Sequence, residues 1–255
     1  MSKVNTWKGA ASVAKSLRNN PLAKNYWRLR WYPVCASTEV SLSNWLNEEQ
    51  SAFKEQQRIA IFAARQNHGR GQLGRAWQSP FGGVWLSAAM PWPDLDNSSG
   101  LLGFAVAVAL CERLERKGIN VKIKWPNDLM VGNKKLAGFL PRLISRGTKI
   151  RFARIGLGLN VCNQVPKEGI SLGELIKTTY CHIDYWASES LIALDHAIEL
   201  ASTPGWVCSE THRRLWAKFV VDPKSGKCWD IEGLNFDGSL RIQRNGKEVN
   251  WSRWN

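Results

Sequence analysis

The chain contains 255 residues and carries a formal net charge of +14, with 44% hydrophobic and 22% charged residues. This length suits one large domain, or one large and one small domain, with a buried core. The longest apolar run, from Leu101 to Cys111, is interrupted by Gly103 and is shorter than the roughly 20 residues that span a bilayer. We therefore expect a globular protein that has no membrane partner.

The basic residues gather at the start of the chain. Seven lysines and arginines precede Trp31, whereas the first acidic residue is Glu39, so this segment supplies half of the net charge. Its composition fits a solvated extension or an organelle transit peptide, and we expect an extension over residues 1–26. The remaining charge is scattered, which favours a mildly basic body over a dedicated nucleic-acid surface.

Hydrophobic periodicity and turn signals predict the elements in chain order. Strands are expected at residues 27–34, 58–65, 84–90, 121–125 and 150–158. Helices are expected at residues 40–50, 99–117, 171–178, 184–201 and 206–216. Gly132-Asn133 is expected to form the turn of a hairpin. The predicted class is α/β (α+β), with a mixed sheet and packed helices over residues 27–216.

The pattern of the sequence changes after Ala217. Short apolar runs alternate there with Asp-Pro, Ser-Gly, Asp-Gly and Asn-Gly turn signals. This spacing predicts a separate small all-β module over residues 217–255.

Six cysteines are present, without a Cys-x-x-Cys pair and without histidines at metal-binding spacing. We therefore predict no metal-ligating residues. Reduced and mostly buried cysteines are typical of a cytoplasmic protein.

A glycine-rich loop, Gly-Arg-Gly-Gln-Leu-Gly-Arg at residues 69–75, follows the second predicted strand. Its letters match a dinucleotide-binding loop, but a Pro-Phe-Gly-Gly turn and a strand follow instead of the required helix. Glycines let a ligand approach the backbone, and arginines bind phosphate and carboxylate oxygens. The loop is either an anion clamp or an ordinary hairpin loop with exposed charges.

Two further segments carry candidate chemistry. Lys-Trp-Pro-Asn-Asp at 124–128 starts the predicted hairpin, and the hairpin returns Lys135 towards Asp128. A lysine at this place would neutralise charge at a phosphate, although a surface lysine beside a turn-forming Asn-Asp pair is the alternative. Ile-Gly-Leu-Gly-Leu-Asn at 155–160 leaves one strand face open, for a flat ligand or for close strand–helix packing.

Taken together and in this order, these segments resemble the biotin protein ligases. The resemblance also includes Ser37-Thr38, Trp77 and the Ser-Pro-Phe-Gly-Gly run at 79–83. It covers about residues 27–200 clearly. It extends faintly to the last 40 residues, where the family carries a small SH3-like β-barrel.

The resemblance implies that ATP, with Mg²⁺, activates biotin as biotinyl-adenylate. A lysine of a biotin carboxyl carrier protein, as in acetyl-CoA carboxylase, then takes the acyl group. The N-terminal extension is too short for the DNA-binding domain of some members, so we expect no operator binding. A homodimer is an open alternative to a monomer. We expect a cytoplasmic location, with organelle targeting as the alternative.

The resemblance also assigns roles to individual residues. The implied biotin-binding residues are Ser37, Thr38, Glu39, Gln66, Arg70, Gly71, Gln72 and Lys135. The implied adenylate-binding residues are Arg75, Trp77, Asn127, Lys135 and Asn160. The implied catalytic residues are Lys135, Arg70 and Asp128. Two positions depart from the family, because Glu39 replaces the commoner asparagine and Gln72 stands where a second basic residue is frequent. We hypothesise that Gln72 weakens retention of the adenylate.

Two competing functions stay open from the sequence. A lipoate ligase or octanoyltransferase shares the broad fold but lacks the combination of the glycine–arginine loop with Lys-Trp-Pro-Asn-Asp. A nucleic-acid binder would use the +14 charge, but it leaves that loop and Lys135 unexplained.

Overall fold

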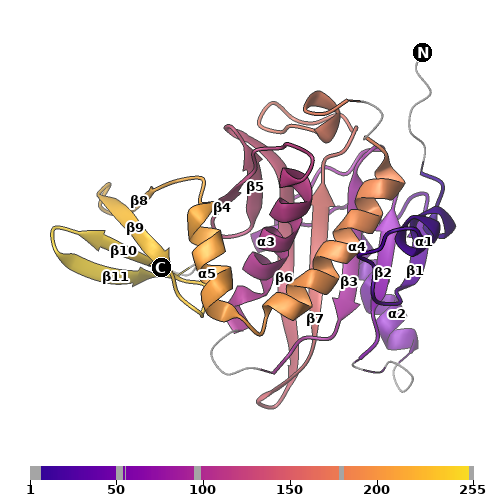
Figure 1. Ribbon diagram of the computed structural model, residues 1–255, viewed down its shortest axis with the longest axis horizontal. Helices are drawn as coiled ribbons and strands as arrows, with labels where there is room; N and C mark the ends of the chain where they lie inside the picture. Colours follow the sequence, from indigo (N-terminus) through magenta and orange to yellow (C-terminus); the bar gives the residue numbers. More distant parts are fainter. Residues whose placement is uncertain (1–6, 50–53, 55, 95–98, 178–180, 253–255) are drawn as a thin grey trace.

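The computed structural model describes residues 7–49, 54, 56–94, 99–177 and 181–252. A seven-stranded sheet with the order β1-β2-β3-β7-β6-β5-β4 forms its centre (Figure 1). β1 and β2 are parallel, and the other neighbours are antiparallel, so the predicted mixed sheet is confirmed. The strands are β1 (Arg28–Tyr32), β2 (Ile59–Ala63), β3 (Val84–Met90), β4 (Lys122–Lys124), β5 (Asp128–Val131), β6 (Lys134–Arg146) and β7 (Lys149–Leu159).

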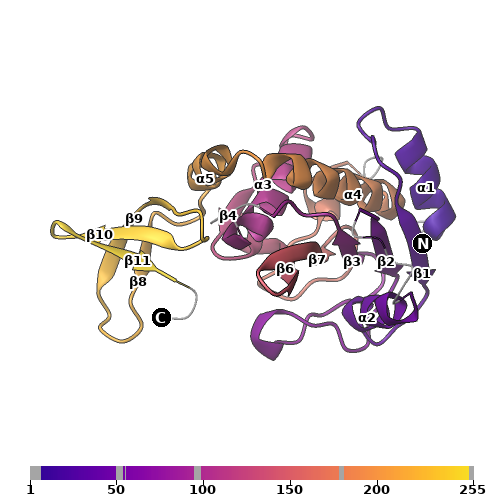
Figure 2. The same ribbon diagram turned by 90° about the horizontal axis from the view of Figure 1, so that it is seen from below.

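Helices cover both faces of this sheet. Figure 2 shows α1, α3, α4 and α5 along one face and α2 on the opposite face. Their bounds are α1 (Ala10–Arg18), α2 (Thr38–Glu48), α3 (Leu102–Glu115), α4 (Ile183–Leu200) and α5 (Pro204–Arg213). In the part of the chain that is described, no helix combines the length and the apolar character needed to cross a bilayer.

The two helical layers explain why β2 reads as one continuous apolar run. Successive side chains of a strand point to opposite faces. Ala60 and Phe62 belong to the main core, whereas Ile59 and Ile61 pack in a second cluster with residues of α2. Every residue of β2 is therefore buried, and the strand shows no polar alternation.

Helix α1 is packed onto the body of the protein. Val13 and Leu17 are buried in the main core. Ser12 Oγ donates a hydrogen bond to Asp184 at 2.7 Å, and the hydroxyls of Ser16 and Ser188 lie 2.8 Å apart, both across to α4. The expectation of a solvated extension is therefore wrong for residues 10–18, because an apolar pair four residues apart gives this basic helix a buried face.

The segment after β7 differs from its prediction. A helix was expected over residues 171–178, but the structure has only a 3-10 turn, Leu172–Glu174, and residue 178 lies outside the described residues. The backbone N–H groups of Leu172 and Gly173 donate to the carbonyls of Asn160 and Val161. These bonds tie the segment to the end of β7.

The C-terminal module is a four-stranded antiparallel sheet with the order β11-β10-β9-β8. Its strands are β8 (Phe219–Val221), β9 (Cys228–Leu234), β10 (Leu240–Arg244) and β11 (Lys247–Trp251). This sheet lies beside α5, at the opposite end of the molecule from α1 (Figure 1). The turn between β9 and β10 reaches the large sheet, since Trp125 Nε1 donates to Gly238 O at 3.0 Å.

Candidate functional site

A cavity of about 170 Å³ lies over β3, β6 and β7. Side chains from these strands, from the start of α2 and from the glycine–arginine loop line it. Thirteen residues were assigned to the site from the sequence, and all but Asn160 are among the lining residues. Those that line it are Ser37, Thr38, Glu39, Gln66, Arg70, Gly71, Gln72, Arg75, Trp77, Asn127, Asp128 and Lys135. The individual roles assigned to them stay predictions.

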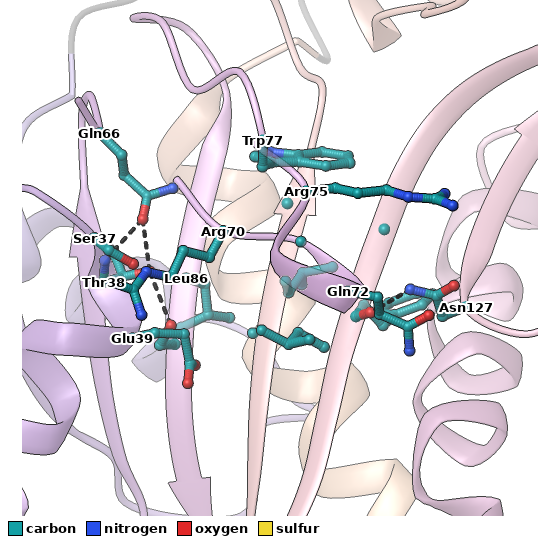
Figure 3. Close-up of a pocket in the computed structure, with 18 of the residues that line it drawn as sticks. Ser37, Thr38, Glu39, Gln66, Arg70, Gln72, Arg75, Trp77, Leu86 and Asn127 are labelled. Carbon is teal, nitrogen blue, oxygen red and sulfur yellow. Dashed lines mark hydrogen bonds between the residues drawn. The ribbon is translucent and has the colours of Figure 1, made fainter. Parts of the chain in front are cut away.

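One end of the cavity is a fixed hydrogen-bonding cluster. Gln66 Oε1 accepts from both the backbone N–H and the hydroxyl of Thr38, at 2.7 and 3.1 Å. The Thr38 hydroxyl also lies 2.8 Å from the hydroxyl of Ser87 on β3. Figure 3 shows Ser37, Thr38 and Gln66 together at this end, with Trp77, Arg75 and Asn127 farther along the cavity. Because these polar groups hold one another, they present a preformed polar wall.

A buried ion pair borders the same end. Arg154, on β7, donates through Nη2 to the Glu39 carboxylate and to the Glu39 carbonyl, each at 3.1 Å. The Arg154 and Glu39 side chains are only 10% and 16% exposed. Glu39 therefore keeps a compensated charge beside the cavity.

The indole ring of Trp77 lies flat on two glycines of the sheet. Gly138 on β6 and Gly158 on β7 are register partners. A Cβ atom added at Gly158 would come within 2.5 Å of the Trp77 ring, and one at Gly138 within 3.0 Å. Of the two alternating glycines expected to leave a strand face open, Gly158 is thus covered by the protein's own aromatic ring, whereas Gly156 meets Leu140 and Glu39 and lines the cavity.

Lys135 lines the cavity beside Asp128 and Trp77. Its Nζ is 2.7 Å from Asp128 Oδ1 and 4.8 Å from the centre of the Trp77 ring. The hairpin with Gly132 at its turn produces this arrangement, since β5 ends at Val131 and β6 begins at Lys134. The prediction that Lys135 and Asp128 face one site is confirmed.

The backbone of Lys135 is held from outside the cavity. Its N–H donates to Glu168 O at 2.8 Å, and its carbonyl accepts from Ile170 N at 3.0 Å. Asn160 Nδ2 donates to the same carbonyl at 3.3 Å. Asn160 is buried and does not line the cavity. Its contacts here support the backbone of Lys135, and the nucleotide contact expected from the resemblance stays a prediction.

The glycine–arginine loop forms a small lid beside the cavity. Gly71 N donates to Arg75 O at 2.7 Å, and Trp77 N donates to Gly69 O at 2.9 Å. Leu73 takes a left-handed backbone conformation, with φ 54°, and its side chain is exposed. Arg70 and Arg75 are also exposed at the cavity mouth. The guanidinium groups of these two arginines, together with Lys135 in the same cavity, favour binding of an anionic ligand.

Ser87 and Arg154 were not identified from the sequence. Ser87 lies inside an apolar strand, and Arg154 is one of several basic residues around β7, so neither has a local motif. Within the described ranges, no group of three His, Cys, Asp or Glu side chains could hold a metal ion.

Comparisons with known proteins identify the family of the chain. The model of the biotin/lipoate A/B protein ligase family matches residues 34–160. A bifunctional ligase/repressor BirA of Salmonella typhimurium is 32% identical over 232 residues, covering 86% of this chain and 70% of that protein. The chain belongs to the biotin/lipoate A/B protein ligase family.

Other family members match over shorter stretches. The bifunctional ligase/repressor BirA of Bacillus subtilis is 37% identical over 111 residues, which cover 42% of this chain and 34% of that protein. The matched segment thus spans about a third of the length of that relative.

The fold is shared with solved biotin protein ligases. The structure from Aquifex aeolicus in complex with biotin and ATP has a TM-score of 0.64 at 22% identity, covering 88% of this chain and 94% of that chain. The enzyme from Helicobacter pylori with bound biotinylated ATP has a TM-score of 0.58 at 24% identity, covering 89% of this chain and all of that chain. At these identities the likeness concerns the fold.

Proposed function

We propose that the protein is an ATP-dependent biotin protein ligase. The observation that carries the proposal is the place of Lys135. Its Nζ lies 2.7 Å from Asp128 Oδ1 and 4.8 Å from the centre of the Trp77 ring, and it lines the same cavity as Thr38 and Gln66. One cation therefore lines the cavity that also contains the polar wall proposed for the acid and the aromatic ring proposed for the nucleotide.

The first step joins the acid to the nucleotide. A carboxylate oxygen of biotin attacks the α-phosphorus of ATP, the bond to the β-phosphate breaks, and pyrophosphate leaves. Lys135 Nζ supplies a positive charge where negative charge gathers on the phosphoryl oxygens. Its ion pair with Asp128 holds the ammonium in position before substrates arrive. Arg70 and Arg75 at the mouth of the cavity add two further cations.

The second step transfers the acyl group. The amine of a carrier-protein lysine attacks the acyl carbon of the mixed anhydride, and AMP leaves. A mixed anhydride hydrolyses in water, so the reaction needs a site from which water is excluded. The loop at residues 69–75, already folded beside the cavity, is placed to close over the intermediate.

Mg²⁺ fits this site as a counter-ion of the phosphates. Among the lining residues, Glu39 and Asp128 carry carboxylates, and Glu39 is already paired with Arg154. Mg²⁺ in nucleotide sites usually takes one or two carboxylates plus substrate phosphates and water. Asp128 is paired with Lys135 in turn, but that pair is more exposed than the Arg154–Glu39 pair. Asp128 is therefore the carboxylate that would hold the ion, and the ion would neutralise phosphate charge.

The partner that follows from this activity is a biotin carboxyl carrier protein. The Paracoccus denitrificans relative, 29% identical over 104 residues, is named for biotin and acetyl-CoA carboxylase. We extend that acceptor to this chain. We also keep a cytoplasmic location and the absence of operator binding as parts of the proposal.

The decisive experiment measures pyrophosphate release from ATP with and without biotin. Wild-type protein and a Lys134→Ala control, altered at the exposed neighbouring lysine, should both release pyrophosphate only with biotin. Lys135→Ala should lose this release by about 100-fold or more, the scale of removing one preorganised charge-stabilising group. No biotin-dependent release in the wild type would overturn the proposal, and release with lipoate or octanoate would identify the sister activity.

A further inference from the structure

Two cysteine side chains, Cys162 and Cys181, lie near each other just beyond the end of β7. Cys162 is exposed, and its backbone N–H donates to Gly82 O at 2.8 Å. Cys181, just before α4, is only 2% exposed, and its Sγ donates to Val161 O at 3.2 Å. The two thiols also lie within hydrogen-bonding reach of each other, so the single Cys181 proton binds either Val161 O or a Cys162 thiolate. A Cβ atom added at Gly173 would lie 3.5 Å from Cys181 Sγ and 3.8 Å from Cys162 Cα.

The two thiols differ in reactivity. The hydrogen bond from Cys181 lowers the pKa of Cys162, whereas the same bond and burial raise the pKa of Cys181. The thiolate is the nucleophilic form of cysteine, and it must be accessible to react. Cys162 meets both conditions and has a second thiol beside it. An accessible, acidified thiol next to a resolving thiol is the arrangement of peroxide-reactive sites.

The stretch of chain between the two cysteines also supports the backbone of Lys135. Glu168 O accepts the Lys135 N–H, and Ile170 N donates to the Lys135 carbonyl. Asn160 binds that carbonyl two residues before Cys162. Both thiols therefore contact the stretch of chain that fixes the backbone of the proposed catalytic lysine.

We propose that Cys162 and Cys181 are a peroxide-oxidisable pair whose disulfide displaces the backbone support of Lys135. The Cys162 thiolate attacks one oxygen of hydrogen peroxide, the O–O bond breaks, and a sulfenic acid and hydroxide form. The Cys181 sulfur then attacks the sulfenic sulfur and expels its oxygen. Two thiols and one peroxide thus give one disulfide and two waters, the thiol protons leaving with the oxygens.

The displacement follows from the contacts that the disulfide replaces. Cys162 Sγ donates to Gly82 O at 3.4 Å, and Cys181 Sγ donates to Val161 O. Both bonds need the thiol protons that oxidation removes. The turn that contains Asn160 then loses two of its anchors while the new covalent bond draws its end towards Cys181. A shift of ~1 Å in a reacting group can lower a rate by ~100-fold.

The test oxidises the full chain with hydrogen peroxide, alkylates the remaining thiols and maps disulfides by mass spectrometry. Wild type and Cys228→Ser should form the Cys162–Cys181 disulfide, since Cys228 is an exposed cysteine on β9 of the other sheet. Cys181→Ser should stop at a sulfenic acid on Cys162, which dimedone captures. A disulfide between other cysteines, or oxidation of Cys228 at a dose that leaves the pair reduced, would overturn the assignment.

A second arm measures activity and rests on the proposed function. Biotin-dependent pyrophosphate release should fall by about tenfold or more after oxidation of the wild type. Dithiothreitol should restore it, and Cys162→Ser should keep its activity at the same peroxide dose. A mapped disulfide with unchanged activity would refute the link to Lys135. If reduced protein releases no pyrophosphate with biotin, the proposed function fails, while the mapping still decides the thiol pair.

Discussion

Gly158 offers a sharp test of how Trp77 serves the site. In Gly158→Ala the new Cβ would lie 2.5 Å from the Trp77 ring. Non-bonded carbon atoms pack at about 3.5–4.0 Å, so one of the two groups must retreat by ~1 Å or more. The backbone of Gly158 is paired with Trp85 and Gly138 on both sides. The ring therefore moves, and with it the surface on which Lys135 rests.

The magnitude follows from the contact that is lost. Lys135 Nζ lies 4.8 Å from the ring centre, and its side chain is 32% exposed. A cation–π contact contributes about 0.5–1 kcal/mol at exposed sites and ~2 kcal/mol when desolvated. A loss of ~1 kcal/mol corresponds to about fivefold in a rate or binding constant. Gly158→Ala should therefore raise KM for ATP by about fivefold and leave KM for biotin nearly unchanged.

Gly156→Ala is the matched control, two residues earlier on the same strand. Its Cβ would meet Leu140 Cβ at 3.2 Å and Glu39 Oε1 at 3.4 Å, at the end proposed for biotin. This variant should raise KM for biotin instead. Steady-state kinetics with each substrate varied in turn, at temperatures where melting curves show both variants folded, would separate the effects. An unchanged KM for ATP in Gly158→Ala, or the same response in both variants, would refute this division of the cavity.

Three further outcomes are expected. Arg154→Met leaves the Glu39 carboxylate buried without its partner and should lower the free energy of unfolding, measured in urea, by ~3 kcal/mol. Adding Glu39→Gln to this variant should recover part of the loss. An unchanged urea midpoint of unfolding in Arg154→Met would contradict the pairing. Gln72→Arg should slow release of free biotinyl-adenylate, measured by rapid filtration, and equal release rates would remove the hypothesis about Gln72. Leu17→Ala should lower the free energy of unfolding by ~2–3 kcal/mol. The control Arg18→Ala, at an exposed position, should lower it by less than ~0.5 kcal/mol. Equal losses in the two variants would mean that α1 does not support the fold.

The sequence was most informative where local chemistry decides the structure. Glycine–asparagine at 132–133 forces a tight hairpin, so the proximity of Lys135 and Asp128 could be predicted before their ion pair was seen. Continuous apolar runs also predicted β2 and β3, because a strand that is buried on both faces has apolar residues at every position.

Features that depend on distant partners could not be predicted in this way. Arg154 meets Glu39 across 115 positions of sequence, and nothing near either residue signals the pair. The alternating glycines of β7 were expected to leave a face open, but only the fold shows that Trp77 covers this face at Gly158 and leaves Gly156 lining the cavity. Likewise, the basic charge of the segment that forms α1 led to the prediction of an extension, whereas the buried side chains of Val13 and Leu17 determine that the helix packs on the core.

The hydrogen bond from Trp125 to Gly238 connects the C-terminal sheet to the end of the cavity that we propose for the nucleotide. Trp125 directly precedes the Pro126-Asn127 step, so the turn that carries Gly238 braces the strand connection from which Asn127 projects. Thermodynamic coupling is reciprocal. If the brace tunes nucleotide affinity, bound nucleotide must in turn slow hydrogen exchange in β9 and β10, far from any atom that it touches.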